Sequence, residues 1–316
     1  MNASLRTLLS GVVDYAGLFP PANLPLDQAI RNYARHRQEA DAWMLGRFVV
    51  PATRLAEFDA YADLFYHRPP FRFSLLGRGG DDAAAFLNGL DRDVKEATDF
   101  ADKHVRRVLP DLLEIRLAAA YNFRLIPLTS ESLGPLGWGV FVEGPLDAGG
   151  EEPLLETLRR IAAVSEESLE TAYRLAPTGY KLRCGGLEAS AFPTVDQVAS
   201  VLAACRDAGV PLKFTAGLHH PIRRFDAGLQ THMHGFVNVF TAGVLAHARR
   251  LPEDALRALI ADEDPADFVF TNDGLRWRDV QASNEEIAVA RRNFVTSFGS
   301  CSFDEPRDDL RALGWL

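Results

Sequence analysis

Apolar runs of strand length alternate with longer amphipathic stretches along most of this chain. Such alternation is typical of a parallel sheet whose strands are connected by helices. The pattern predicts eight strands, at residues 11–16, 43–50, 71–76, 112–117, 139–143, 179–183, 212–215 and 268–271. Eight strand–helix units close naturally into a (β/α)8 TIM barrel of the α/β class.

Helices are predicted to begin near residues 26, 53, 81, 153, 194, 235 and 284, with a short or irregular connection near residue 130. Thr194 and Gln197 have the spacing of a capping box, and Ser283 precedes two glutamates in a predicted first turn. With 316 residues, of which 47% are hydrophobic, the chain suits a single barrel domain over residues 1–316. A short C-terminal extension is expected from about residue 299.

The amino-acid composition indicates which kinds of molecule the protein binds. The net charge is −9 and the basic residues are scattered among acids, which excludes a phosphate-tracking nucleic-acid surface. Three widely spaced cysteines fit a reducing compartment, so we expect a cytoplasmic protein. No signal peptide or membrane span is expected. The predicted partners are a small anionic substrate and, in a homo-oligomer, other copies of the chain.

Charged residues fall within or directly after the predicted strands. Barrel active sites lie at the C-terminal ends of the strands, and charges are rarely buried unless they are paired. Several of these side chains are therefore expected to converge on one polar pocket. The set is Asp14, Arg47, Arg78, Glu114, Arg116, Glu143, Lys181, Arg183, Lys213, Asn272 and Asp273.

Lys181 and Lys213 occupy corresponding positions of consecutive predicted strands. A lysine amine becomes a nucleophile when a neighbouring cation or a dry pocket depresses its pKa. The pair therefore suggests Schiff-base chemistry, whereas the plain structural alternative is two lysines whose ends reach solvent. A full ion pair between Lys181 and Glu143 is expected to prevent an imine, because the amine would stay charged, and would place a metal-assisted reaction first.

Arginines suggest an anionic ligand, because a guanidinium binds carboxylate or phosphate through two hydrogen bonds. Arg47, Arg116 and Arg183 are the candidates on the predicted strands. Gly217 and Asn272 follow predicted strands seven and eight, where barrels often bind phosphate. His219 and His220 are candidate acid–base or substrate-contacting groups.

A divalent metal is an alternative that the same residues leave open. His219, His232 and His234 cluster in the sequence, and Glu114 and Glu143 could complete a ligand set. This alternative gives a metal-assisted lyase, isomerase or hydrolase. A second alternative is a non-catalytic protein that binds an anionic metabolite.

The order of short motifs resembles the deoxyribose-phosphate aldolase family and its class I aldolase relatives. The matching segments, spread over residues 11–220, are Val12-Val-Asp14-Tyr-Ala-Gly-Leu18-Phe-Pro20, Arg47-Phe-Val-Val-Pro51, Ser74-Leu-Leu-Gly77, Leu113-Glu-Ile-Arg116, Val140-Phe-Val-Glu143 and the two lysine segments. The resemblance implies a Schiff-base role for Lys181, a pKa-lowering role for Lys213 and a pocket-lining role for Asp14. It departs at Arg116, which stands where the family has a proton-shuttling aspartate, and at Arg183 beside the nucleophile.

The sequence thus predicts an enzyme of lyase or aldolase type that acts on an anionic carbonyl compound through an imine at Lys181. Asp14, Lys213, Glu114 and Glu143 would complete the catalytic set, with Glu114, Glu143 or a histidine moving protons. No cofactor is needed in this scheme, and a divalent metal is needed only in the alternative.

Overall fold

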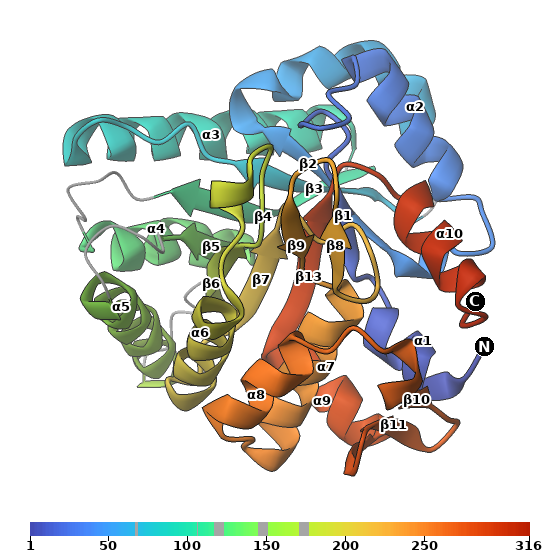
Figure 1. Ribbon diagram of the computed structural model, residues 1–316. Coiled ribbons are helices and arrows are strands. Elements are labelled where there is room, and N and C mark those ends of the chain that lie inside the picture. The colour runs from blue at the N-terminus through green and yellow to red at the C-terminus, as the bar shows by residue number, and fades with distance from the viewer. Residues whose placement is uncertain (67–68, 106, 117–122, 145–150, 171–176) are drawn as a thin grey trace. The chain divides into compact units, whose positions relative to one another are not determined.

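A closed barrel of eight strands forms the main sheet of the computed structural model, which describes residues 1–316 except 67–68, 106, 117–122, 145–150 and 171–176 (Figure 1). Its strands are β1 (Val13–Tyr15), β2 (Leu45–Pro51), β3 (Phe71–Leu76), β4 (Val108–Arg116), β5 (Gly139–Glu143), β6 (Thr178–Arg183), β7 (Leu212–Thr215) and β13 (Val295–Ser300). Neighbours follow the order β1-β13-β7-β6-β5-β4-β3-β2, and the described register pairs are parallel. The (β/α)8 prediction is confirmed.

Helices connect the strands. The α-helices are α1 (Ala3–Leu9), α2 (Leu26–His36), α3 (Ala83–Lys103), α4 (Leu125–Leu133), α5 (Glu151–Glu170), α6 (Val195–Asp207), α7 (Phe236–Arg249), α8 (Glu253–Ile260), α9 (Asn284–Asn293) and α10 (Asp304–Ala312). The 3-10 helices are η1 (Ala42–Met44), η2 (Ala52–Tyr66), η3 (Gly134–Leu136), η4 (Ala189–Ala191) and η5 (Pro265–Asp267). Both expected N-terminal caps are confirmed, since Thr194 and Ser283 each form a complete capping box. Among the described residues, none of these helices combines the length and the apolar character that a membrane crossing requires.

The prediction of the eighth barrel strand is wrong. Residues 268–270 form β10 (Phe268–Phe270), which pairs antiparallel with β11 (Gly274–Trp277) in a small sheet completed by β12 (Val280–Ser283). A tight turn joins β10 to β11, so this segment makes a hairpin and cannot take part in parallel closure. The eighth strand is β13, which begins after α9 and contains Gly299, where we expected an extension to start.

The chain divides into two compact units. The second unit holds residues 30–34 and 47–181. Its core contains a cluster of edge-to-face aromatic rings through which η2 packs on β2 and β3; the Phe48 and Phe58 ring centroids are 5.3 Å apart, as are those of Phe58 and Phe73. Figure 1 shows α3, α4 and α5 outside strands β3 to β5 of this unit. The strands therefore have one face covered by helices, which leaves their other face for the polar side chains described below.

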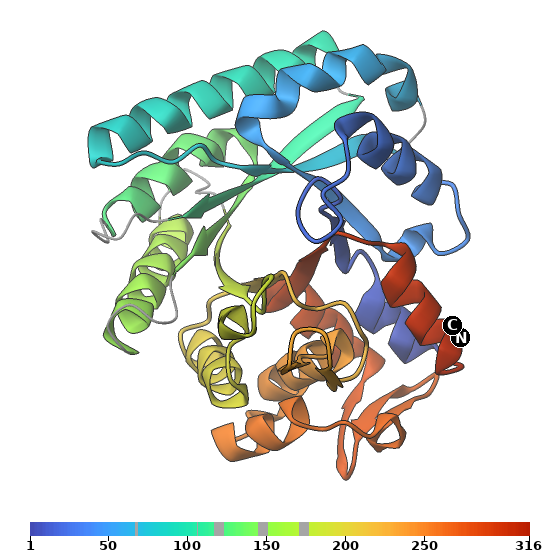
Figure 2. The same ribbon diagram turned by 45° about the horizontal axis from the view of Figure 1, so that its top comes forward.

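The first unit holds residues 1–29, 35–46 and 182–316. Helix α7 is buried from Phe236 to Ala246 and packs with α6, α8 and α9, and the Phe214 and Phe240 rings join β7 to it with centroids 5.4 Å apart. A second hairpin, β8 (Arg224–Asp226) with β9 (Thr231–Met233), follows β7. Figures 1 and 2 show the two chain ends beside each other, near α1 and α10.

Candidate functional site

Lys181 lies between two carboxylates in the second unit. Its Nζ is 2.7 Å from Glu114 Oε2 and 2.8 Å from Glu143 Oε2. Ser74 Oγ donates a hydrogen bond of 2.5 Å to the other oxygen of Glu114. All four residues are buried, with relative exposures between 0% and 8%. We call these four residues the Lys181 cluster.

Strand register brings the Lys181 cluster together. Glu143 of β5 is the register partner of Lys181 on β6 and of Arg116 on β4. Alternate residues of a strand face the same side of the sheet, so Glu114, two residues before Arg116, shares its face. Apolar residues precede these charges on each strand, and the register brings the charges of the three strands to one another.

The two carboxylate partners of Lys181 determine the protonation state of its amine. Burial alone would lower the pKa of its amine, but the charges and hydrogen bonds of Glu114 and Glu143 outweigh burial and raise the pKa above its ordinary value. Our expectation that the amine is neutral in the resting protein is therefore wrong. Lys181 is an ammonium group that two carboxylates hold in place.

Lys213 has a separate partner in the first unit. Its Nζ is ion-paired with Asp14, and Ser297 Oγ lies 3.4 Å from the amine and donates to Asp14 over 2.7 Å. Asp14 and Lys213 are 0% and 1% exposed. Gly46 makes room for this pair, because a β-carbon there would lie 2.3 Å from Asp14 Oδ1. Asp14, for which the resemblance implies a pocket-lining role, is fully buried and forms an ion pair with Lys213.

His219 and His220 each bind a carboxylate of α10. His219 Nδ1 is 2.9 Å from Glu305 Oε2, and His220 Nδ1 is 2.5 Å from Asp309 Oδ2. The hydrogen bond from His219 lowers the pKa of Glu305, which keeps it ionised. Glu305 and Asp309 are one helical turn apart and so project from the same face of α10.

The remaining histidines of the metal alternative face other partners. His232 Nε2 lies 3.3 Å from Glu263, whereas the buried His234 Nε2 donates to the carbonyl oxygen of Pro193 over 2.7 Å. Within the described residues of the first unit, His219, His232 and His234 therefore do not converge. Glu114 and Glu143 hold Lys181 instead of presenting free carboxylates to an ion.

Three predicted arginines have different surroundings. Arg47 lies in the first half of β2, where its Nε is 2.6 Å from Asp111, which also binds Arg72. This is a structural ion pair away from the strand end. Arg116 and Arg183, by contrast, are the exposed last residues of β4 and β6.

Gly217 and Asn272, which we expected near a bound phosphate, lie in different parts of the first unit. Gly217 has a φ of +71°, and a β-carbon there would lie 2.5 Å from the carbonyl oxygen of Cys184, so glycine is required where the loops after β6 and β7 touch. Asn272 lies in the β10–β11 turn and accepts a hydrogen bond of 3.2 Å from the backbone of Ala3. It follows no barrel strand, which corrects our placement of it at the substrate site.

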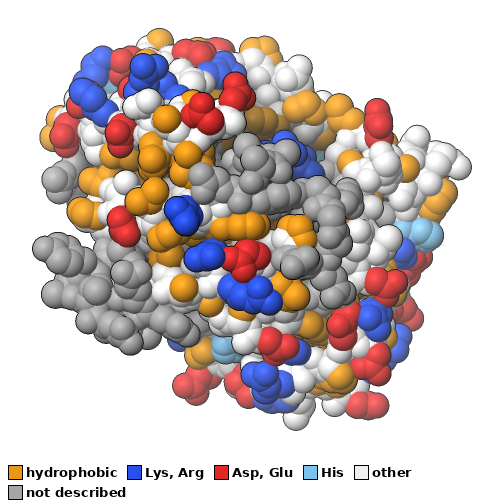
Figure 3. All heavy atoms as spheres, turned by 90° about the vertical axis from the view of Figure 1, so that its left-hand side faces the viewer, with side chains coloured by type: hydrophobic (Ala, Val, Ile, Leu, Met, Phe, Trp, Pro, Cys, Tyr) orange, Lys and Arg blue, Asp and Glu red, His pale blue; other side chains and the backbone are white. Residues whose placement is uncertain are grey.

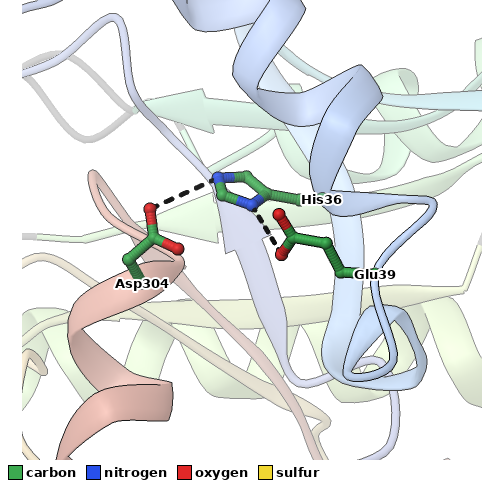
Figure 4. Close-up of side chains that lie close together, drawn as sticks. All are labelled: His36, Glu39 and Asp304. Atoms are coloured by element: carbon green, nitrogen blue, oxygen red, sulfur yellow. Dashed lines mark hydrogen bonds and ion pairs between the residues drawn. The ribbon is translucent and has the colours of Figure 1, made fainter.

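A third group of acids and histidine lies in the first unit, at His36, Glu39 and Asp304 (Figure 4). The two ring nitrogens of His36 face different carboxylates, with Nδ1 3.2 Å from Glu39 and Nε2 3.8 Å from Asp304. Arg307 binds both carboxylates as well. A single ion could use only one nitrogen of His36 and would meet the Arg307 guanidinium, so we interpret the group as an ion-pair network that anchors α10.

A cavity of about 520 Å³ opens in the second unit between the loop after β3 and helix α3. Arg78 and Arg92 contribute to its lining, and Arg78 is held by Asp93 at 2.5 Å. Figure 3 shows a face of the molecule on which basic side chains are interspersed with acidic and hydrophobic ones. Neither feature identifies a ligand by itself.

Sequence reasoning missed four polar partners. Ser74 and Ser297 are buried small polar residues within otherwise mostly apolar strands, and this is the local signal that could have indicated a polar partner. Glu305 and Asp309 have the i, i+4 spacing of one helix face, but nothing in the sequence links that face to His219 and His220.

Comparisons with known proteins are sparse. No protein-family model matches the chain, and no curated protein matches it. One similar solved structure is that of deoxyribose phosphate aldolase from Aeropyrum pernix, described as a tetramer. The two chains are 12% identical with a TM-score of 0.49, over 98% of this chain and 93% of the other. A likeness at this level does not show a family or an activity.

Proposed function

We propose that this chain is an enzyme of lyase or aldolase type that forms an imine between Lys181 and a small carbonyl compound. The observation that carries the proposal is the buried ammonium group of Lys181, held 2.7 and 2.8 Å from two carboxylates. From the sequence alone we expected such an ion pair to prevent an imine. We propose instead that it supplies the base, because either carboxylate can accept the proton of Lys181 directly and so convert the charged lysine into a nucleophile at the moment of reaction.

The choice of residue type supports the proposal. The chain has four lysines among its 34 basic residues, and it uses arginine for most of its ion pairs. Lys95 and Lys103 are exposed on α3, whereas Lys181 and Lys213 are buried on barrel strands beside carboxylates. Arginine cannot give up its proton to form an imine, so lysine at these two positions favours chemistry over a purely structural pair.

The reaction begins with a proton transfer. Lys181 gives a proton to Glu143, because the hydrogen bond from Ser74 favours the ionised form of Glu114. The free electron pair of Nζ forms a bond to the carbonyl carbon. The oxygen takes one proton from the attacking nitrogen and a second one back from Glu143, and it leaves as water. The resulting iminium withdraws electrons from a neighbouring carbon–carbon or carbon–hydrogen bond, and water later releases the product and restores the amine.

Arg116 supplies the anion-binding part of the proposal. It is exposed at the end of β4 and is the register partner of Glu143, itself the partner of Lys181. Neighbouring parallel strands are about 4.8 Å apart, so two spacings separate the Arg116 and Lys181 backbones. A short carbonyl compound with a carboxylate or phosphate fits this span. The cytoplasmic location and assembly with other copies stay predictions from the sequence.

Borohydride trapping tests the imine. The protein is incubated with acetaldehyde, pyruvate and other short aldehydes and keto acids, reduced, and mapped by peptide mass spectrometry. We expect label on Lys181, faster at higher pH because the raised pKa limits the neutral amine. Lys181→Met should abolish that label, and Lys95→Met is the matched control with an exposed lysine.

The carboxylates give a second, independent readout. Glu143→Gln should slow trapping at pH 7 by about 100-fold, the lower end of the range for general acid–base groups. Glu114→Gln should slow it less. Labelling spread over the four lysines, or none on Lys181 at any pH up to 10, would defeat the imine and leave a structural ion pair.

A further inference from the structure

Two imidazole–carboxylate pairs lie side by side in the first unit, at the loop after β7. Their rings belong to His219 and His220, with centroids 6.4 Å apart, and their carboxylates to Glu305 and Asp309. The histidine side chains are 14% and 12% exposed, so solvent reaches them. The carboxylates lie one turn apart on α10, which fixes both rings from one helix face.

The hydrogen bonds determine which nitrogen is available. An ionised carboxylate can only accept, so Nδ1 of each neutral ring carries the proton and Nε2 carries a lone pair. Within the described residues, neither Nε2 atom of His219 and His220 has a hydrogen-bond partner. Each of the two adjacent rings therefore offers one electron-pair donor, and the ring planes are inclined by 51° to each other.

We propose that His219 and His220 bind one divalent transition-metal ion through their Nε2 atoms, with Glu305 and Asp309 as the carboxylates that orient the rings. Histidines that bind metals commonly donate the other ring N–H to a carboxylate. Imidazole nitrogen suits zinc, copper, nickel and iron better than calcium or magnesium. This pair differs from the sets considered above, which use Glu114, Glu143 or His36.

One tetrahedral ion requires the two rings to approach each other. Metal–nitrogen bonds of roughly 2.0–2.1 Å place two ring centres about 6.4 Å apart in a linear arrangement and about 5.2 Å apart in a tetrahedral one. The observed separation is 6.4 Å, so we expect the partly exposed rings to move roughly 1 Å closer when an ion binds. Two coordination positions then remain for water or a ligand, as in an open site.

The His36 network is the competing place for an ion. His36 presents its two nitrogens to different carboxylates, and Arg307 already neutralises both of these carboxylates. Among the residues that the structure describes, neither Glu305 nor Asp309 forms an ion pair with an arginine. The two places are therefore distinguished by single substitutions.

Calorimetry with zinc chloride tests the proposal on the full chain after treatment with a chelator. We expect one Zn²⁺ per chain, and Co²⁺ should give visible absorption bands from a nitrogen-coordinated ion. His219→Gln and His220→Gln should each weaken binding by more than about 100-fold, and Glu305→Gln and Asp309→Asn by about 10–100-fold. His36→Asn and His232→Asn are controls that should keep full affinity.

Two outcomes would overturn the proposal. Either Zn²⁺ fails to bind at 1:1 stoichiometry, or affinity survives in both His219→Gln and His220→Gln. Loss of affinity in His36→Asn alone would assign the ion to the His36 network. Circular dichroism of each variant checks that it is folded. The glutamine and asparagine substitutions on α10 preserve the shape of the side chain. The result does not depend on an imine at Lys181, so the two proposals fail separately.

Discussion

Replacing Lys181 by methionine should destabilise the protein strongly. The change leaves Glu114 and Glu143, whose side chains are 2% and 10% exposed, buried without the cation that lies 2.7 and 2.8 Å away. Removing one partner of a buried ion pair costs about 3–5 kcal/mol. For a chain of 316 residues this corresponds to a fall in melting temperature of roughly 5–8 °C.

Thermal and urea denaturation of matched variants would measure this cost. Lys95→Met removes an exposed partner of Asp99 and should cost at most about 1 kcal/mol. The triple variant Lys181→Met, Glu114→Gln, Glu143→Gln has no buried charge at these positions, so it should recover most of the lost stability.

Acidity gives a further check on the same variant. Protonating one of the two carboxylates removes their repulsion in Lys181→Met, so its deficit relative to the unchanged protein should shrink as the pH falls from 7 towards 4. A cost below about 1 kcal/mol at pH 7, with no dependence on pH, would refute the reasoning. It would mean that water reaches the Lys181 cluster and screens its charges.

Three other substitutions test separate parts of the structure. Arg116→Lys keeps the charge but loses the planar fork, so the pyruvate concentration for half-maximal trapping at Lys181 should rise several-fold; an unchanged value removes Arg116 from the site. Lys213→Met should lower the free energy of unfolding in urea by about 3–5 kcal/mol, and adding Asp14→Asn should restore most of the loss. Equal trapping at Lys181 in Lys213→Met would show that Lys213 does not affect the reactivity of Lys181. Gly217→Ala should lower stability by at least about 1 kcal/mol, because of its positive φ and the contact with Cys184, and equal stability would mean that the loop shifts freely.

Local patterns in the sequence were enough to predict most of the barrel. Seven strands lie where apolar runs of strand length predict them, and the capping boxes at Thr194 and Ser283 mark helix starts, because both signals come from neighbouring residues. The eighth strand was mistaken because residues 268–271 have the same local character as β13. Only pairing partners distinguish an antiparallel hairpin from the strand that closes a barrel.

The partners of each charge were decided by the tertiary structure. The sequence identified Lys181, Glu114, Glu143, Lys213 and Asp14 as charges on strands, since a charge within an apolar run is a local observation. It did not determine that Lys181 binds both glutamates, because register between strands sets which carboxylates meet an amine. The sign of the pKa shift at Lys181 follows from those distances and therefore reversed our expectation.

For the same reason, the sequence could not predict the two histidine–carboxylate pairs at His219 and His220. Their carboxylates lie 86 and 89 residues away, on a helix whose sequence indicates only an acidic, solvated face. The sequence by itself determined which chemical groups the barrel carries. The tertiary structure decided which groups touch, because hydrogen bonds and ion pairs act over a few ångströms in space and not along the chain.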